Sequence, residues 1–295
     1  MRGKTFGESV AWVLNGFFPA SLSGWDVDFS VGRRPCRFVS MNHRLFIAEL
    51  WRNHSLHYDF LERSLFSKLT GENRNVTQWA AIAIRIAVLF GIYSELSRRG
   101  VARFDISVIS GDFTDPIAAW YARAMGLPID TIICCCNENS AVWDLLHSGE
   151  LATGTATIQT DIPGMDYVCP PSLERLLYEC FGRDEVKRYL SVCDKRGTYR
   201  LNPEDTQLLR KNMVSAVVRS ARCDTLIRNI YRTHGYIMDP YVATAFAGLQ
   251  EYRSSSGDGK TSVLLSDGTP MRFAERVLAA TGLSEQELRK KLNYA

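Results

Sequence analysis

The strongest constraint on the fold is an alternation of strand-like and helix-like segments between residues 104 and 147. Residues 104–109 and 129–136 are apolar runs of strand length, and each is followed by a polar loop and a helical pattern, at 116–125 and 141–147. Strands joined through a helix return to the same edge of a sheet and therefore run parallel. We expect an α/β protein with three layers, in which helices cover both faces of a parallel sheet.

The flanking segments fit the same architecture. Residues 75–99 form a long apolar pattern, which predicts a helix buried on most of its sides. Short apolar runs at 44–51 and 262–265 predict two further strands. Residues 172–199 predict helix in two pieces, and the serine- and glycine-rich run at 254–259 predicts a flexible loop.

Composition restricts the class of partner. The chain has 295 residues, of which 46% are hydrophobic, enough for a large core. Its net charge of +3 comes without a clustered basic face, so we expect no nucleic acid partner. The longest apolar run, 79–91, is interrupted by Arg85 and is shorter than the ~20 residues that cross a bilayer. Since the N-terminus also lacks the pattern of a signal peptide, we expect a cytoplasmic protein that does not bind membranes.

The eight cysteines do not indicate a metal site, because no C-x-x-C pair is present. Cys134, Cys135 and Cys136 lie in the predicted strand at 129–136, where cysteine acts as a small hydrophobic residue. Neighbouring residues of a strand point to opposite faces, so the three thiols cannot converge on one metal ion. No histidine is close in sequence to activate a thiol. We therefore predict that the triplet belongs to the core.

A short loop at 110–115 joins the strand at 104–109 to the next helix. In a parallel sheet this position binds anions, because free backbone N–H groups and the positive end of the helix dipole face the loop. However, Gly111 is its single glycine, and Asp112 and Asp115 would repel a phosphate group. The loop by itself therefore does not define a ligand.

This loop and the segments after it carry motifs in a fixed order. The three motifs are Ser110-Gly111-Asp112-Phe113-Thr114-Asp115, Ala122-Arg123-Ala124-Met125-Gly126-Leu127-Pro128 and Asn137-Glu138-Asn139-Ser140. They resemble the S-G-N-F-G-N, A-x-x-x-G-L-P and N-x-N-D motifs of threonine synthases, which are pyridoxal-phosphate enzymes of fold type II (tryptophan synthase β-like). Further matches occur in the family's order at Asn75, Met165-Asp166, Ser172-Leu173-Glu174-Arg175, Gly235-Tyr236-Ile237-Met238-Asp239-Pro240 and residues 265–273. The chain thus resembles a shortened and degenerate threonine synthase.

The resemblance reaches the segment that holds the cofactor lysine in that family. The family motif E-L-F-H-G-P-T-L-A-F-K-D-F contains the lysine that forms a Schiff base with pyridoxal phosphate. The matching segment here is Glu49-Leu50-Trp51-Arg52-Asn53-His54-Ser55-Leu56-His57-Tyr58-Asp59-Phe60. Asp59 stands at the position of the lysine, or, with a gap of one residue, the lysine is deleted. In both alignments the resemblance implies that the covalent anchor of the cofactor is missing.

The resemblance also implies a division into two domains. Residues 1–70 resemble the family's N-terminal region, and residues 71–295 resemble its large domain. The smaller, cofactor-facing domain, which contains an S-G-D-T-G segment in the family, has no counterpart between Phe60 and Asn75. We therefore expect the large domain of a fold type II enzyme with the smaller domain largely missing.

Within the large domain, the resemblance implies a remnant of the cofactor pocket. Its residues are Asn75, Ser110, Gly111, Asp112, Phe113, Thr114, Asp115 and Asp267. Several of these depart from the family pattern: Asp112, Thr114 and Asp115 replace Asn, Gly and Asn in the phosphate loop. Asp267 replaces the threonine near the pyridine nitrogen. Two histidines of the family are replaced by Thr269 and Tyr241.

The roles of these acidic residues stay open at the level of sequence. Asp59, Asp112, Asp115 and Asp267 are either solvated or capping acids in a decayed pocket, or they form a new site for a cation or an amine ligand. The neighbouring His54, Ser55 and His57 suggest a nucleophile with a base, but adjacent positions of a helix do not face one another.

Three functions remain as hypotheses. In the first, the protein is a threonine synthase-like pseudoenzyme that binds a small amino-acid-like ligand or regulates an active synthase partner, alone or as an oligomer. In the second, it is an active pyridoxal-phosphate-dependent lyase that makes threonine from O-phosphohomoserine and uses an unmatched lysine, such as Lys4 or Lys68. In the third, it performs different chemistry in the same cleft.

Overall fold

The central element of the molecule is a six-stranded sheet, seen in a computed structural model that describes residues 37–50, 74–211, 213–266 and 268–293. In these residues the strand order is β1-β2-β8-β3-β4-β7. The bounds are β1 (Arg37–Asn42), β2 (Leu45–Glu49), β3 (Phe104–Ile109), β4 (Ile129–Cys136), β7 (Met213–Val217) and β8 (Ser262–Ser266). Neighbouring strands are parallel except for the β1–β2 hairpin. The predicted parallel sheet is confirmed, with one antiparallel strand at its edge.

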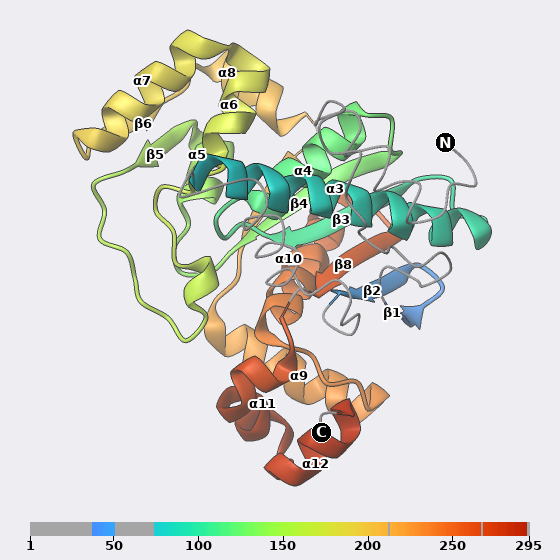
Figure 1. The fold of residues 1–295 in the computed structure, drawn as a ribbon. Coiled ribbons are helices and arrows are strands. Elements are labelled where there is room, and N and C mark those ends of the chain that lie inside the picture. Colours follow the sequence, from blue (N-terminus) through green and yellow to red (C-terminus); the bar gives the residue numbers. More distant parts are fainter. Residues whose placement is uncertain (1–36, 51–73, 212, 267, 294–295) are drawn as a thin grey trace.

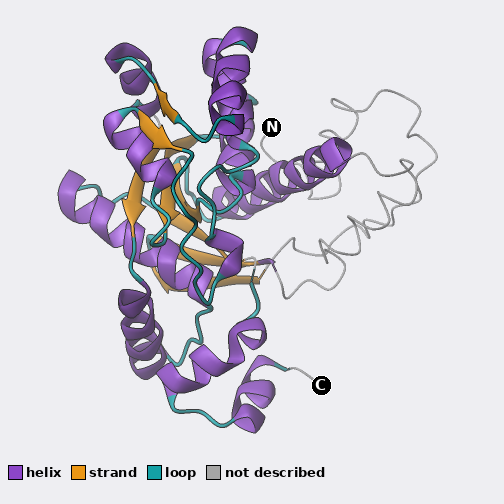
Figure 2. Ribbon diagram, turned by 90° about the vertical axis from the view of Figure 1, so that its left-hand side faces the viewer, coloured by secondary structure: helices purple, strands orange, loops and turns teal. Residues whose placement is uncertain are grey.

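Helices lie on both faces of this sheet (Figure 1, Figure 2). The helices α3 (Arg74–Arg98) and α4 (Thr114–Ala124) pack on one face, and α10 (Pro240–Ser256) packs on the other. Alternate strand residues supply the two cores, because successive side chains point to opposite faces. Ile106 of β3 lies in the core under α3 and α4, whereas Ile133 of β4 and Leu264 of β8 lie in the core under α10. The predicted three-layer α/β architecture is confirmed.

The cysteine triplet of β4 is divided between these two cores. Cys134 and Cys136 lie on the side of α3 and α4, and Cys135 lies on the side of α10. All three side chains are fully buried. Burial raises the pKa of the Cys135 thiol to about 12 and that of the Cys136 thiol to about 11, so both thiols are neutral at neutral pH. The prediction that the triplet belongs to the core is confirmed.

Two groups of elements extend beyond the sheet (Figure 1). After β4, α5 (Ala141–Ser148) packs on β4 and β7. The first group follows it and consists of β5 (Glu150–Ala152), α6 (Leu173–Phe181), α7 (Arg183–Asp194), β6 (Thr198–Arg200) and α8 (Pro203–Arg210). The second consists of α9 (Ser220–His234), α11 (Ala274–Thr281) and α12 (Glu285–Leu292). Two 3-10 turns, η4 (Pro163–Met165) and η5 (Pro270–Phe273), lie near the carboxyl edge of the sheet. Within the described ranges, no helix has the length and apolar character needed to cross a membrane.

Two predictions about local structure are wrong, and some strands were missed. Residues 198–199 belong to β6 and not to a helix, because Tyr199 is buried against Tyr189 in an edge-on ring contact and β6 pairs with β5. The helix α10 continues to Ser256, so the predicted loop at 254–259 begins only at Gly257, which has a φ of 70°. The strand β7 was not predicted at all.

The proposed domain boundary at residue 70 falls in the segment 51–73, outside the described residues. Strands from both sides of this boundary share one sheet, since β2 pairs with β8 in parallel register from Leu45 and Ser262 onward. The two halves of the proposed division therefore contribute to a common sheet.

Candidate site at the carboxyl edge of the sheet

The predicted phosphate loop lies between β3 and α4, as the sequence indicates. The Ser110 N–H donates to the carbonyl oxygen of Cys135 at 2.8 Å, which ties the loop to the neighbouring strand β4. The Phe113 N–H donates to the Ser110 carbonyl at 2.7 Å and closes a tight turn. Phe113 has a left-handed φ of 71° although it is not glycine, and its side chain is fully buried. Burial of this ring holds the turn in its unusual conformation.

A carboxylate occupies the start of α4. The Thr114 N–H, which is one of the free donors at the N-terminus of a helix, donates to Asp112 Oδ1 at 2.9 Å. Thr114 itself is buried, and its hydroxyl lies 3.5 Å from the Ser172 hydroxyl. Asp112 precedes the N-cap residue Phe113 and accepts from the first N–H of α4, which is close to the capping role that the sequence left open for it.

Asp115 has a different role, because it forms an ion pair with Arg85 of α3. The side chains are 11% and 16% exposed, so the pair is largely removed from water. Arg85 is the residue that interrupts the apolar run at 79–91. For Asp115 the expectation of a solvated or capping acid is thus wrong. Its charge is neutralised by a cation 30 residues away in the chain, which sequence reasoning did not connect to it.

Two glycines bring a second loop and a tyrosine ring close to the phosphate loop. A Cβ atom on Gly111 would lie 2.8 Å from the carbonyl oxygen of Gly164 in η4. A Cβ atom on Gly164 would collide with the hydroxyl of Tyr241. Tyr241 is 5% exposed, and its ring packs edge-on against Phe273 with centroids 5.0 Å apart. The tyrosine at the position of a family histidine therefore fills space beside the loop.

A polar network after β4 accounts for two of the family-like motifs. Asp166 Oδ1 accepts from Asn137 Nδ2 at 2.7 Å, from Asn139 Nδ2 at 3.1 Å and from the Thr160 hydroxyl at 2.8 Å. Its second oxygen accepts from the Thr160 N–H at 2.8 Å. Asn139 Oδ1 also accepts from the Ile158 N–H at 2.8 Å. The matching asparagines and the aspartate thus anchor the loop at 158–166 against the end of β4.

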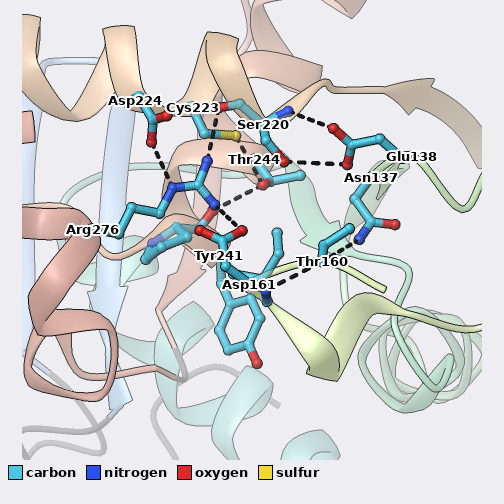
Figure 3. Close-up of polar contacts among 12 residues, drawn as sticks. Asn137, Glu138, Thr160, Asp161, Ser220, Cys223, Asp224, Tyr241, Thr244 and Arg276 are labelled. Atoms are coloured by element: carbon cyan, nitrogen blue, oxygen red, sulfur yellow. Dashed lines mark hydrogen bonds and ion pairs between the residues drawn. The ribbon is translucent and has the colours of Figure 1, made fainter. Parts of the chain in front are cut away.

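Arg276 of α11 connects this loop to α9 (Figure 3). Its guanidinium donates to Asp224 at 2.6 Å, to Asp161 at 2.8 Å and to the Ser220 carbonyl at 2.8 Å. The start of α9 is also held from β4, because Glu138 accepts from the N–H of Ser220 at 2.9 Å. Sequence analysis missed Arg276. The signal for it was weak, since an arginine on a helix is usually solvated.

The carboxyl end of β8 is fixed by Asp239. Its Oδ1 accepts from the Tyr241 and Val242 N–H groups and so caps α10, while its Oδ2 accepts from the Ser266 hydroxyl at 2.9 Å. The loop that follows Ser266 contains Thr269, whose hydroxyl caps η5. The D-P motif at Asp239 thus joins β8 to α10 through buried hydrogen bonds.

The remaining predicted residues fall partly outside the described structure. Asp59 and Asp267 lie outside the described residues, and so do Lys4 and Lys68. Asn75 lies in the first turn of α3, and its side chain is not described. The residues of the predicted pocket that the structure brings together are Ser110, Gly111, Asp112, Phe113, Thr114 and Asp115.

This architecture occurs in solved proteins. The fold matches the pyridoxal-phosphate-bound threonine synthase of Brucella melitensis with a TM-score of 0.66 and 23% identity, over 84% of this chain and 54% of that one. It matches yeast threonine synthase with a TM-score of 0.65 and 24% identity, over 73% and 47%. The protein thus has the α/β fold of the fold type II pyridoxal-phosphate enzymes.

The sequence gives the more particular relationship. The chain is 30% identical to threonine synthase of Pseudomonas aeruginosa over 210 residues, which are 69% of this chain and 43% of that protein. It is 25% identical to human threonine synthase-like 1 over 178 residues, 58% of this chain and 24% of that protein. No family model matches. The predicted resemblance to the threonine synthase family is confirmed, and the chain spans less than half the length of these curated relatives.

The loop at the start of α4 does not fit a phosphate group in the observed arrangement. The Asp112 carboxylate already uses the Thr114 N–H that an anion would need. Two like charges 4 Å apart repel by about 1 kcal/mol in water and by about 4 kcal/mol at an effective dielectric constant of 20. Arg85 of α3 is paired with Asp115. At the position that the resemblance assigns to its phosphate, pyridoxal phosphate would therefore meet a carboxylate.

Proposed function

We propose that the protein is a threonine synthase-like pseudoenzyme, which binds a ligand or a partner without performing the synthase reaction. The observation that carries this proposal is the hydrogen bond from the Thr114 N–H at the start of α4 to Asp112, because the resemblance assigns the cofactor's phosphate to this position. The alignment of Asp59 with the family's lysine supports the proposal independently. Without that lysine the cofactor has no covalent anchor, and no amine is positioned to move protons.

The distribution of lysines supports the same proposal. Lys211 and Lys260 each lie two residues before a strand, β7 and β8 respectively, at the edge of the sheet opposite to the phosphate loop. The four other lysines of the described ranges are exposed on α7, at its end or on α12: Lys187, Lys195, Lys290 and Lys291. A lysine that replaced the family's anchor would therefore have to come from the part of the chain that the structure does not describe, which contains Lys4 and Lys68.

The partner in this proposal is a small amino-acid-like ligand held in the cleft, or an active synthase that the protein regulates in the cytoplasm. Either partner suits a chain that keeps the architecture of the large domain, including the network around Asp166 and the cap at Asp239. Asn137, Asn139 and Asp239 are buried, and such hydrogen-bonded polar groups maintain the shape of the carboxyl edge.

The first experiment titrates the purified protein with pyridoxal phosphate and records the absorbance spectrum and threonine formation from O-phosphohomoserine. The threonine synthase of Pseudomonas aeruginosa serves as the positive control. We expect neither a lysine-linked cofactor band nor threonine. Threonine formation above the level of a protein-free blank would contradict the proposal and would establish the lyase with an unmatched lysine.

The second experiment tests the partner. The tagged protein is purified from its native host, and the co-purifying proteins are identified by mass spectrometry, while the purified protein is screened against amino acids by thermal shift. A co-purifying synthase or a stabilising amino acid supports the proposal. The absence of both would contradict a binding or regulatory role.

A further inference from the structure

The N-terminus of α4 has the geometry of an anion site, but the chain supplies its own anion. The helix has 11 residues, and its first donors point into the loop that follows β3. Two of the donors at this turn are already bonded: Thr114 N–H to Asp112 Oδ1 at 2.9 Å, and Phe113 N–H to the Ser110 carbonyl at 2.7 Å. The carboxylate of Asp112 therefore stands where an external oxyanion would bind.

Asp112 is held in this position from its backbone as well. The Ser172 N–H, at the start of α6, donates to the Asp112 carbonyl oxygen at 3.1 Å. Ser172 is buried, and its hydroxyl lies 3.5 Å from that of Thr114. Phe113, the next residue, is fully buried in a left-handed conformation. Because these contacts fix the backbone at Asp112 and Phe113, the fold defines the position of the carboxylate.

The space next to the loop is also occupied. Gly111 can approach the Gly164 carbonyl only because it lacks a side chain, and Gly164 in turn makes room for the Tyr241 hydroxyl. The positive charge that reaches the loop from α3 is used by the Arg85–Asp115 pair. With Arg85 paired to Asp115, the carboxylate of Asp112 keeps a negative charge at the start of α4 that a phosphate group would meet.

From these contacts we infer that Asp112 sets ligand specificity at the N-terminus of α4 by excluding phosphate monoesters. The ligand that the cleft accepts then has no phosphate at this end, which selects unphosphorylated amino-acid-like molecules over phosphorylated cofactors and substrates. This inference deepens the proposed function and rests on it for the existence of a ligand in the cleft.

The test is the substitution Asp112→Asn, which removes the charge and keeps an oxygen that can accept from the Thr114 N–H. The probes are inorganic phosphate, pyridoxal phosphate and pyridoxal, and the readout is non-covalent affinity by calorimetry. We expect the unsubstituted protein to bind no inorganic phosphate and to prefer pyridoxal phosphate over pyridoxal by less than about twofold. The Asp112→Asn variant is expected to gain a preference for pyridoxal phosphate of about tenfold or more, in line with the removal of like-charge repulsion.

The matched control is Asp184→Asn on α7, which removes one negative charge from an exposed side chain far from the loop in sequence. A similar gain of phosphate affinity in this control would mean that net charge, and not the position of Asp112, governs binding. Asp112→Ser is the second variant, since serine also caps helices, and circular dichroism verifies that each variant is folded. If folded Asp112→Asn and Asp112→Ser both fail to bind phosphate, the inference is wrong.

The outcome separates this inference from the proposed function. Non-covalent phosphate binding by the unsubstituted protein overturns the role of Asp112 but leaves the absence of the synthase reaction intact. Threonine formation overturns the proposed function, whatever the phosphate affinity of the variants.

Discussion

The ion pair between Arg85 and Asp115 gives a quantitative prediction about the link between α3 and α4. The two side chains are 16% and 11% exposed. Breaking a fully buried pair by removing one partner costs about 3–5 kcal/mol, whereas an exposed pair contributes about 0.2–1 kcal/mol. Since this pair retains some contact with water, we expect Asp115→Asn to lower the free energy of unfolding by about 2 kcal/mol.

The assay is urea denaturation of Arg85→Met, Asp115→Asn and the double variant, which together form a double-mutant cycle. We expect a coupling energy of at least about 1 kcal/mol, because each single change leaves the other charge without its partner. The exposed Lys187–Asp184 pair on α7 is the control, and its cycle is expected to give less than about 0.5 kcal/mol. Equal coupling energies for the two pairs would refute the reasoning that burial makes the Arg85–Asp115 pair strong.

Three further predictions concern stability. Burial raises the pKa of Asp105 to about 6 from an ordinary 3.8, so the folded state binds the extra proton and stability should fall as the pH rises from about 4 to about 6. Asp105→Asn should abolish this pH dependence, measured as the midpoint of urea denaturation at each pH, and should stabilise the protein at pH 7 by about 1–3 kcal/mol. An unchanged pH profile in the variant would contradict this role of Asp105. A Cβ on Gly248 of α10 would collide with the Cys135 thiol, so Gly248→Ala should lower the free energy of unfolding, measured by thermal denaturation, by about 1–3 kcal/mol. A Cβ on Gly197 would make only ordinary contacts, so Gly197→Ala is the control and should cost less. Equal effects of the two substitutions would argue against the close packing of α10 on β4. Asp166→Ala removes the acceptor of four hydrogen bonds and should make the loop at 158–166 sensitive to limited proteolysis. An unchanged cleavage pattern would show that this network does not hold the loop.

The parts of the fold that the sequence predicted are those with strong local signals. The strands β3 and β4 were predicted with their observed bounds, because both are continuous apolar runs between polar loops. The strand β7 was missed, since Ser215 interrupts its short apolar run and it lies at the edge of the sheet, where residues stay partly exposed. Its place is set by pairing with β4, which no local pattern encodes.

The residues of the candidate site show the same difference between local signals, which the sequence predicts, and contacts that depend on tertiary packing. The loop at 110–115 and the capping role open to Asp112 follow from a strand that leads into a helix, and both are local. Arg85, the partner of Asp115, lies 30 residues away in the chain, and the two asparagine partners of Asp166 lie 27 and 29 residues away, so these contacts depend on tertiary packing. The central arginine of an apolar helix was nevertheless a usable signal, because a charge at a buried position requires an acidic partner.

The packing of Tyr241 against Gly164 shows a further limit. The sequence indicates only that a tyrosine replaces a histidine, and the change could equally enlarge or fill the cleft. The structure shows that the ring is buried beside Phe273 and that two glycines, Gly164 and Gly268, accommodate it. The consequence of such a substitution depends on neighbours that are distant in sequence.

The central claim is that this relative of the threonine synthases carries no lysine-bound cofactor. It is tested most directly by incubating the protein with pyridoxal phosphate, reducing with borohydride and measuring the intact mass, followed by peptide mapping. We predict an unchanged mass at cofactor concentrations that fully label the Pseudomonas aeruginosa threonine synthase. A stoichiometric adduct on one lysine of the folded protein, lost after unfolding before the reaction, would contradict the account.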